Sequence, residues 1–125
     1  MELPHRYPFR WLDRVGPESV RVEITTGSFW LRGDGSLPAP FCAEIVAQAA
    51  ATLLVPSGSE PRQRWLAGID SLELTRALRA GERLEIRVRP EATFGGIVKV
   101  AGEIYALPAG EGEPERVATA KLLLA

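Results

Sequence analysis

PAPFCAEIVAQAAATLLV, residues Pro38 to Val55, is an apolar segment that carries a single ionisable carboxylate, Glu44. Gln48 and Thr52 follow that carboxylate at intervals of four residues, so the three polar side chains share one face of a helix. The segment therefore predicts an almost fully buried helix with one narrow polar stripe. Because a charge on a buried helix is costly unless it is paired, Glu44 is the best candidate in the chain for chemistry.

Prolines, glycines and alternating residues mark the ends of this helix and the strands around it. Pro40 suits the first helical turn, where its missing N–H costs nothing, and Pro56 ends the helix at Val55. Residues 19–26 alternate between apolar and polar, and everything after the helix reads as strands bounded by turns that contain Gly or Pro. We expect strands over Ser19–Thr26, Trp65–Leu74, Glu82–Pro90, Gly96–Leu107 and Glu115–Leu124.

The links between the later strands are short, which favours pairing between neighbours in the sequence. Across Arg79–Gly81, Phe94–Gly96 and Pro108–Pro114 we expect antiparallel pairs. Because the helix is apolar nearly all round, one sheet face cannot cover it completely. We therefore expect an α+β fold with a curved antiparallel sheet of about five strands wrapped round one long central helix, or a helix that lies against a partner. The hot-dog fold, in which two such sheets join across a dimer, meets both conditions.

Composition and charge limit the classes of partner. With 125 residues, 46% of them hydrophobic and 25% charged, the chain is expected to form one domain over residues 1–125. A net charge of −1 gives nucleic acid binding no electrostatic support. We expect no signal peptide and no membrane span, since the N-terminus has no apolar run and no stretch of about 18 apolar residues occurs. The single cysteine, Cys42, favours a reducing compartment, so we expect a cytoplasmic protein.

Motifs along most of the chain resemble one family, in the same order. Leu3–Phe9 (LPHRYPF) with Leu12–Val15 (LDRV) resembles the opening of the FabZ-type 3-hydroxyacyl-acyl-carrier-protein dehydratases. Glu44–Ala50 (EIVAQAA) resembles their central helix, and Leu66–Asp70 (LAGID) and Ala80–Leu84 (AGERL) resemble their next two strands. The resemblance implies a hot-dog homodimer, or a higher oligomer of dimers, that binds an acyl thioester. The phosphopantetheine of acyl carrier protein or coenzyme A comes with the substrate, so no cofactor and no metal are expected.

The chain departs from this family at the residue that removes a proton. The family pattern G-H-F-P-x-x-P-x-x-P-G-x-x-x-x-E places its glutamate on Glu44 and its last proline on Pro38, and an ungapped count then puts Trp30 at the histidine. The one histidine, His5, belongs to the N-terminal motif, where it is expected to have a structural role. An indole N–H only donates, so Trp30 cannot act as a general base. The dehydration machinery of the family is therefore incomplete here.

Other residues are expected to bind the acyl thioester. Ala39 replaces a family glycine whose N–H polarises the thioester carbonyl, and alanine retains that N–H although its methyl group narrows the approach. Gln48 is expected to orient Glu44, touch the thioester, or make an interface hydrogen bond. Trp30 would line or plug the former histidine position. Gly95 and Gly96 either allow close approach of pantetheine to a strand edge or form an ordinary turn.

Three functions are compatible with these residues. The chain is also similar to the dehydratase-like proteins of aryl polyene clusters, which lack the G-H-F-P loop and have a helix opening like its LPAPFCAE, residues 37–44. The first function is therefore a dehydratase-like lyase in fatty acid or polyketide metabolism. The alternatives are a non-catalytic acyl-thioester-binding subunit, which would pair with a homologue that has the histidine, and a thioesterase with Glu44 as the general base. Four arginines are candidates to meet an acidic carrier protein: Arg62, Arg64, Arg76 and Arg79.

Overall fold

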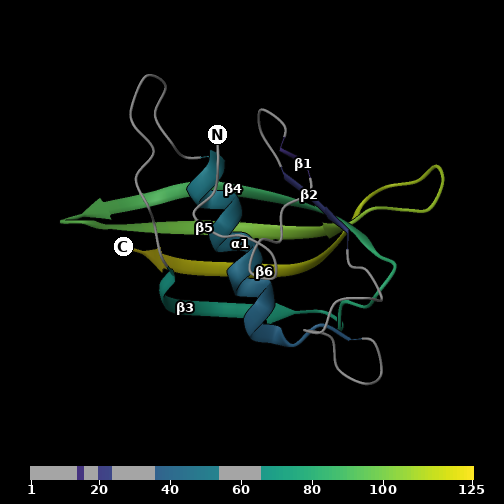
Figure 1. The fold of residues 1–125 in the computed structure, drawn as a ribbon, viewed down its shortest axis with the longest axis horizontal. Coiled ribbons are helices and arrows are strands. Elements are labelled where there is room, and N and C mark those ends of the chain that lie inside the picture. The colour runs from purple at the N-terminus through teal and green to yellow at the C-terminus, as the bar shows by residue number, and fades with distance from the viewer. Residues whose placement is uncertain (1–13, 16–19, 24–35, 54–65) are drawn as a thin grey trace.

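The computed structural model describes residues 14–15, 20–23, 36–53 and 66–125 of the chain (Figure 1). These residues form one helix and a six-stranded antiparallel sheet in the order β1-β2-β4-β5-β6-β3. The helix α1 covers Ala39–Leu53, and the strands are β1 (Arg14–Val15), β2 (Val20–Glu23), β3 (Leu66–Leu74), β4 (Arg83–Phe94), β5 (Ile97–Ala106) and β6 (Glu115–Leu124).

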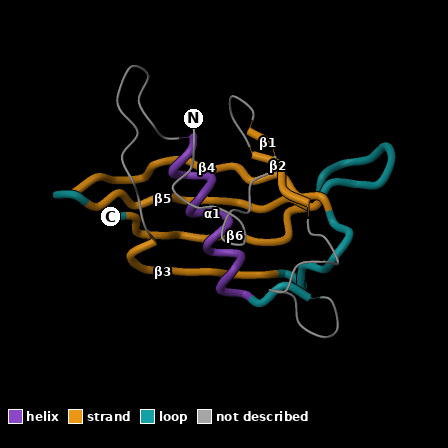
Figure 2. The backbone as a smooth tube through the Cα atoms, in the orientation of Figure 1, coloured by secondary structure: helices purple, strands orange, loops and turns teal. Residues whose placement is uncertain are grey.

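The helix lies across one face of the curved sheet, as the sequence predicted. It contacts β3, β4, β5 and β6, and Figure 2 shows it crossing in front of these strands. The expected helix over 40–55 and the four later strands are confirmed within the described residues, and β2 confirms the middle of the strand expected over 19–26. The sheet has one strand more than the five expected, and β1 is only two residues long. The fold class predicted from the sequence is therefore confirmed.

The strand expected to end at Pro90 is longer, so that boundary is wrong. β4 continues through Pro90 to Phe94, and its register with β5 shifts between Pro90 and Ala92. Such a shift marks a β-bulge, where the ladder is locally disrupted and a proline is tolerated. The other edge of β4 pairs with β2 only over Arg83–Ile86 among the described residues, so Pro90 interrupts no described ladder on that side.

The expected pairing across Arg79–Gly81 is also wrong. β3 pairs with β6 at the edge of the sheet, whereas β4 pairs with β5 and β2. The connection from β3 to β4 therefore passes two intervening strands, a span of about 14 Å at strand spacings of about 4.8 Å. Residues 75–82 are long enough to cover it. The two other hairpins, β4 with β5 and β5 with β6, form as predicted.

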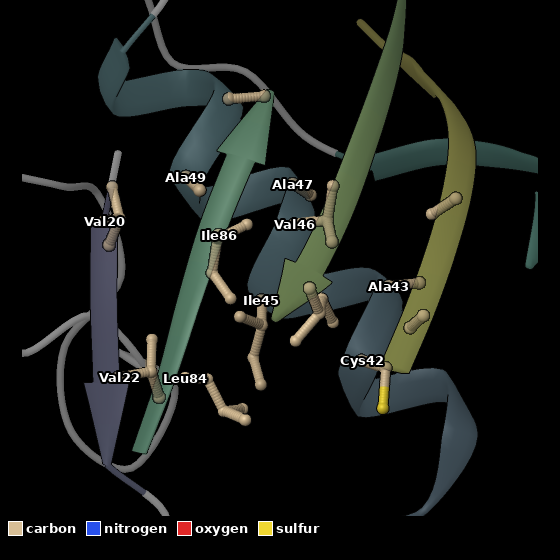
Figure 3. Close-up of a cluster of buried hydrophobic side chains, with 14 of the residues drawn as sticks. Val20, Val22, Cys42, Ala43, Ile45, Val46, Ala47, Ala49, Leu84 and Ile86 are labelled. Atoms are coloured by element: carbon tan, nitrogen blue, oxygen red, sulfur yellow. The ribbon is translucent and has the colours of Figure 1, made fainter. Parts of the chain in front are cut away.

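The core lies between α1 and the sheet face that the helix crosses (Figure 3). Cys42, Ile45, Val46 and Ala49 are fully buried on the helix. The sheet contributes alternate residues of each strand, since side chains on a strand alternate between its two faces; among those fully buried are Val20, Leu84, Ile86, Val100, Ile104 and Leu122.

One glycine lets the helix approach the sheet closely. Gly102 on β5 faces Val46, and a Cβ atom added there would overlap the Val46 Cγ1 atom. Small residues at the contact allow a short distance between a helix and a sheet, so the depth at which α1 sits depends on this pair.

The opposite face of the sheet is covered by side-chain ion pairs and by no other element of the described chain. Arg87 pairs with Glu85 at 2.9 Å and lies over the Tyr105 ring at 4.3 Å, and Arg116 pairs with Glu103 at 3.4 Å. Charged side chains on a sheet face are typical of contact with solvent. A binding site for an apolar acyl chain is therefore expected on the helix side.

We expect Gly102→Ala to destabilise the protein, because Val46 must move or α1 must lift from the sheet. Overpacking of this kind costs about 1 to 3 kcal/mol, which urea unfolding followed by circular dichroism would measure. Gly68→Ala is the matched control, since a Cβ there meets Leu123 Cδ1 at an ordinary 3.6 Å. Adding Val46→Ala to Gly102→Ala should recover part of the loss. Equal effects of the two glycine substitutions would contradict this packing.

Candidate functional site

The polar stripe predicted on the helix is present and internally hydrogen-bonded. Gln48 Nε2 donates to Glu44 Oε1 at 3.3 Å, and Thr52 Oγ1 donates to the backbone oxygen of Gln48 at 3.0 Å. Residues four apart on a helix lie one above the other, which brings these groups together. The structure thus places Glu44 and Gln48 in direct contact.

The two side chains differ in exposure. Gln48 is only 1% exposed, whereas Glu44 is partly buried. A buried amide is stable only when it is hydrogen-bonded, and its bond to Glu44 limits the rotamers open to both side chains. The carboxylate is therefore held from one side and partly accessible from another. A carboxyl group in such a position can act as a general base or, in its acid form, as a general acid.

The helix begins next to this carboxylate. Phe41 N–H donates to the Pro38 carbonyl oxygen at 3.0 Å, which closes the first turn, and Ala39 is the first helical residue. Pro40 supplies no N–H, so the amide donors of this turn come from the residues on either side of it. Ala39 and Glu44 both lie in the first two turns of α1, which keeps the donor expected for a carbonyl near the carboxylate.

A connection that the sequence did not associate with the site holds the segment before α1. Leu37 N–H donates to the Leu78 carbonyl oxygen at 2.7 Å, and Ser36 forms an isolated antiparallel bridge with Arg79. Leu78 is fully buried. Because these contacts join residues about 40 positions apart, no local pattern signalled them.

Cys42 lies beside this start of the helix but is chemically protected. Burial raises the pKa of its thiol to about 11. The thiolate is the reactive form of cysteine, so Cys42 is a core side chain, as expected for a buried cysteine.

The remaining candidates are placed elsewhere or lie outside the described residues. Trp30, His5, Arg62 and Arg64 are outside them. Gly95 and Gly96 are exposed in the turn between β4 and β5, which lies at one end of the sheet, away from α1 (Figure 1). Gly95 has a φ of 59°, a backbone conformation suited to a tight turn. Within a single chain this turn lies away from Glu44. The role of Gly95 and Gly96 in binding therefore stays a prediction.

Arg76, a candidate to meet an acidic carrier protein, is paired within the chain. It lies 2.6 Å from Glu82 and 3.3 Å from Glu115, so its charge is already matched.

Among the described residues, no group of three or more His, Cys, Asp or Glu side chains could hold a metal ion. No helix in that part of the chain is long and apolar enough to cross a membrane.

Comparison with known proteins places this geometry in context. No family model matches the chain. The chain is 32% identical over 124 residues to the 3-hydroxyacyl-[acyl-carrier-protein] dehydratase FabZ of Haemophilus influenzae, covering 82% of this chain and 81% of that protein.

Solved structures share the hot-dog fold. The dehydratase heterocomplex ApeI:P from Xenorhabdus doucetiae has a TM-score of 0.72 and 23% identity, covering 98% of this chain and 86% of that chain. A variant of a hexameric broad-specificity acyl-coenzyme A thioesterase has a TM-score of 0.66 and 13% identity, covering 90% and 80%.

We expect the Cys42 thiol to resist modification in the folded protein. With a pKa of about 11, only about one thiol in a thousand is ionised at pH 8, and burial adds a steric barrier. Ellman's reagent should react slowly with the native protein and completely in urea. Burial favours the neutral thiol. The contribution of the buried Cys42 side chain to folding stability is therefore fully present below the pKa of the unfolded chain, and it is lost as the pH rises through about 11. Rapid reaction of native protein at pH 8 would contradict this placement.

Proposed function

We propose that this chain, which belongs to the FabZ family of 3-hydroxyacyl-[acyl-carrier-protein] dehydratases, binds acyl thioesters of carrier protein or coenzyme A in fatty acid or polyketide metabolism. The observation that carries the proposal is the hydrogen-bonded pair of Glu44 and Gln48 on the helix that crosses the sheet. The phosphopantetheine arm would arrive with the substrate, so the proposed function needs no resident cofactor.

Each residue of the proposed site has a distinct role. Ala39 N–H would donate to the thioester carbonyl oxygen and stabilise negative charge on it. Glu44, in its protonated form, would give its proton to the hydroxyl group as the C–O bond breaks and water leaves. Gln48 would hold the Glu44 carboxyl in place through the bond at 3.3 Å.

Dehydration also needs a base that removes a proton from the carbon next to the carbonyl. In this chain Trp30 occupies the position that the family pattern gives to histidine, and indole cannot accept that proton. A second subunit that carries the histidine would supply the missing base. The similarity in fold to a dehydratase heterocomplex supports this second candidate function, a partner subunit of an active homologue.

The edge strand β3 is the surface that we propose for the partner. Among the described residues β3 pairs on one side only, with β6, so its other edge is open to a further strand. Ile69 on β3 is 46% exposed, which is unusual for a large apolar side chain. Addition of a second copy, or of a homologue, would extend the sheet and cover this residue. The proposed location is cytoplasmic, which suits a chain whose single cysteine forms no disulfide.

We expect Glu44→Gln to abolish turnover of 3-hydroxyacyl and 2-enoyl thioesters above the uncatalysed rate. Loss of one acid–base group lowers rates by about 10² to 10⁴, which the absorbance of the conjugated enoyl thioester would follow. Glu103→Gln is the matched control, because Glu103 is a carboxylate on the other face of the sheet. Equal rates for wild type and Glu44→Gln, both alone and with a histidine-bearing homologue added, would contradict a role for Glu44. Release of free thiol by wild type would instead identify a thioesterase.

If the chain is a partner subunit, activity should appear only when a histidine-bearing homologue is added. We expect Ile69→Asp to weaken self-association or association with that homologue by at least tenfold, since a charge would enter the new interface. Sedimentation velocity would measure it. Phe94→Asp is the matched control, because Phe94 is also a large exposed apolar residue, at 51%, but lies at the hairpin end. A monomer that binds no homologue would contradict this interface.

A further inference from the structure

The connection between β3 and β4 is tied to the residues that lead into α1. Leu37 N–H donates to the Leu78 carbonyl oxygen at 2.7 Å, and Ser36 bridges to Arg79. Leu37 comes two residues before Ala39, the first residue of the helix. The position at which α1 begins therefore depends on where this connection lies.

The connection is itself held in place by ion pairs among three charged side chains. Arg76 Nη2 lies 2.6 Å from Glu82 Oε1 and 3.3 Å from Glu115 Oε1. Arg76 stands at the beginning of the connection and Glu82 at its end, whereas Glu115 begins β6. One guanidinium thus joins both ends of the connection to a strand inside the sheet.

The second carboxylate oxygen of Glu82 connects this ion-pair network to the residues that contact the segment before the helix. Glu82 Oε2 accepts a hydrogen bond from the Arg79 N–H at 2.7 Å. Leu78 contacts Leu37, and its neighbour Arg79 bridges to Ser36. An unbroken series of contacts therefore runs from Arg76 through Glu82 to Leu37.

Two members of this network, Arg76 and Glu82, are favoured in their charged forms. The hydrogen bonds that Arg76 donates to Glu82 and to Glu115 hold its pKa above its usual range. Burial alone would raise the pKa of Glu82, but the bonds from Arg76 and from the Arg79 N–H together lower it. The network is therefore held by charge-assisted hydrogen bonds, the stronger kind.

The position of this network is better explained by placement of the helix start than by overall stability. Exposed ion pairs contribute little to the free energy of unfolding, and the connection is already anchored in the core by Leu78. A catalytic or binding geometry, by contrast, loses much of its effect when a group moves by about 1 Å. Ala39 and Glu44 follow Leu37 within two turns of helix.

We propose that Arg76 is a positioning residue that, through Glu82 and the β3–β4 connection, sets the place of Ala39 N–H and Glu44 relative to a bound acyl thioester. This rests on the proposed function, because it assigns Ala39 and Glu44 to that site. Arg76 itself touches neither the thioester nor the reacting atoms.

The test compares Arg76→Ala and Arg76→Lys with Arg116→Ala in the full chain. Arg116→Ala is the matched control, because it removes an ion pair at 3.4 Å on the outer sheet face. Amide hydrogen exchange at Leu37 is the first measurement. The second is affinity for an acyl-pantetheine thioether, which lacks the reactive ester.

We expect Arg76→Ala to speed exchange at Leu37 at least tenfold and to weaken thioether binding about tenfold, with a urea midpoint close to that of the control. Arg76→Lys should restore part of the protection at Leu37 and part of the thioether affinity. Lysine keeps the positive charge but lacks the forked guanidinium that donates to two carboxylates. Glu82→Gln is a second variant. It removes the negative charge that pairs with Arg76, whereas its amide oxygen still accepts the hydrogen bond from the Arg79 N–H.

Unchanged exchange at Leu37 in Arg76→Ala and Glu82→Gln would overturn the proposal, as would an equal change in the control. Failure of wild type to bind the thioether would instead refute the proposed function. In that case the exchange at Leu37 still decides whether Arg76 holds the start of α1.

Discussion

The contact between Val46 on α1 and Gly102 on β5 sets the depth at which the helix lies in the sheet. A larger residue at Gly102 would lift the helix and open the core beneath it. Because α1 sits so deep, its sheet-facing residues are fully buried and its polar stripe occupies a different face. Glu44 and Gln48 are therefore presented by a rigid element, and rigid elements hold a site more accurately than loops do.

The chemistry open to this site follows from what that stripe contains. The pair at 3.3 Å provides one carboxyl group with a fixed neighbour, which is enough to bind a hydroxyl or to transfer one proton. It is not enough to remove a carbon-bound proton and release a hydroxyl group together. In the proposed function, the lack of a second acid–base group, and not the fold, distinguishes the chain from the dehydratase pattern of its family. We propose that a second subunit across the β3 edge supplies the missing base.

The connection between β3 and β4 has two structural roles. It carries the chain from β3 at the edge of the sheet past β6 and β5 to β4, and it contacts the segment that leads into α1. The proposed interface and the proposed site are thus joined by one connection of eight residues, 75–82. Its charged residues, Arg76 among them, first suggested a carrier-protein surface, but the ion pairs with Glu82 and Glu115 favour a role inside the chain.

Sequence alone determined the features that depend on local geometry. The four-residue spacing of Glu44, Gln48 and Thr52 requires one helix face, so their contacts could be predicted, and short turns made the β4–β5 and β5–β6 hairpins predictable. The tertiary structure alone decided that β3 pairs with β6, that β4 passes Pro90 through a bulge, and that Leu78 holds Leu37. These outcomes depend on how segments that are separate in the chain pair in three dimensions, so no local period of the sequence records them.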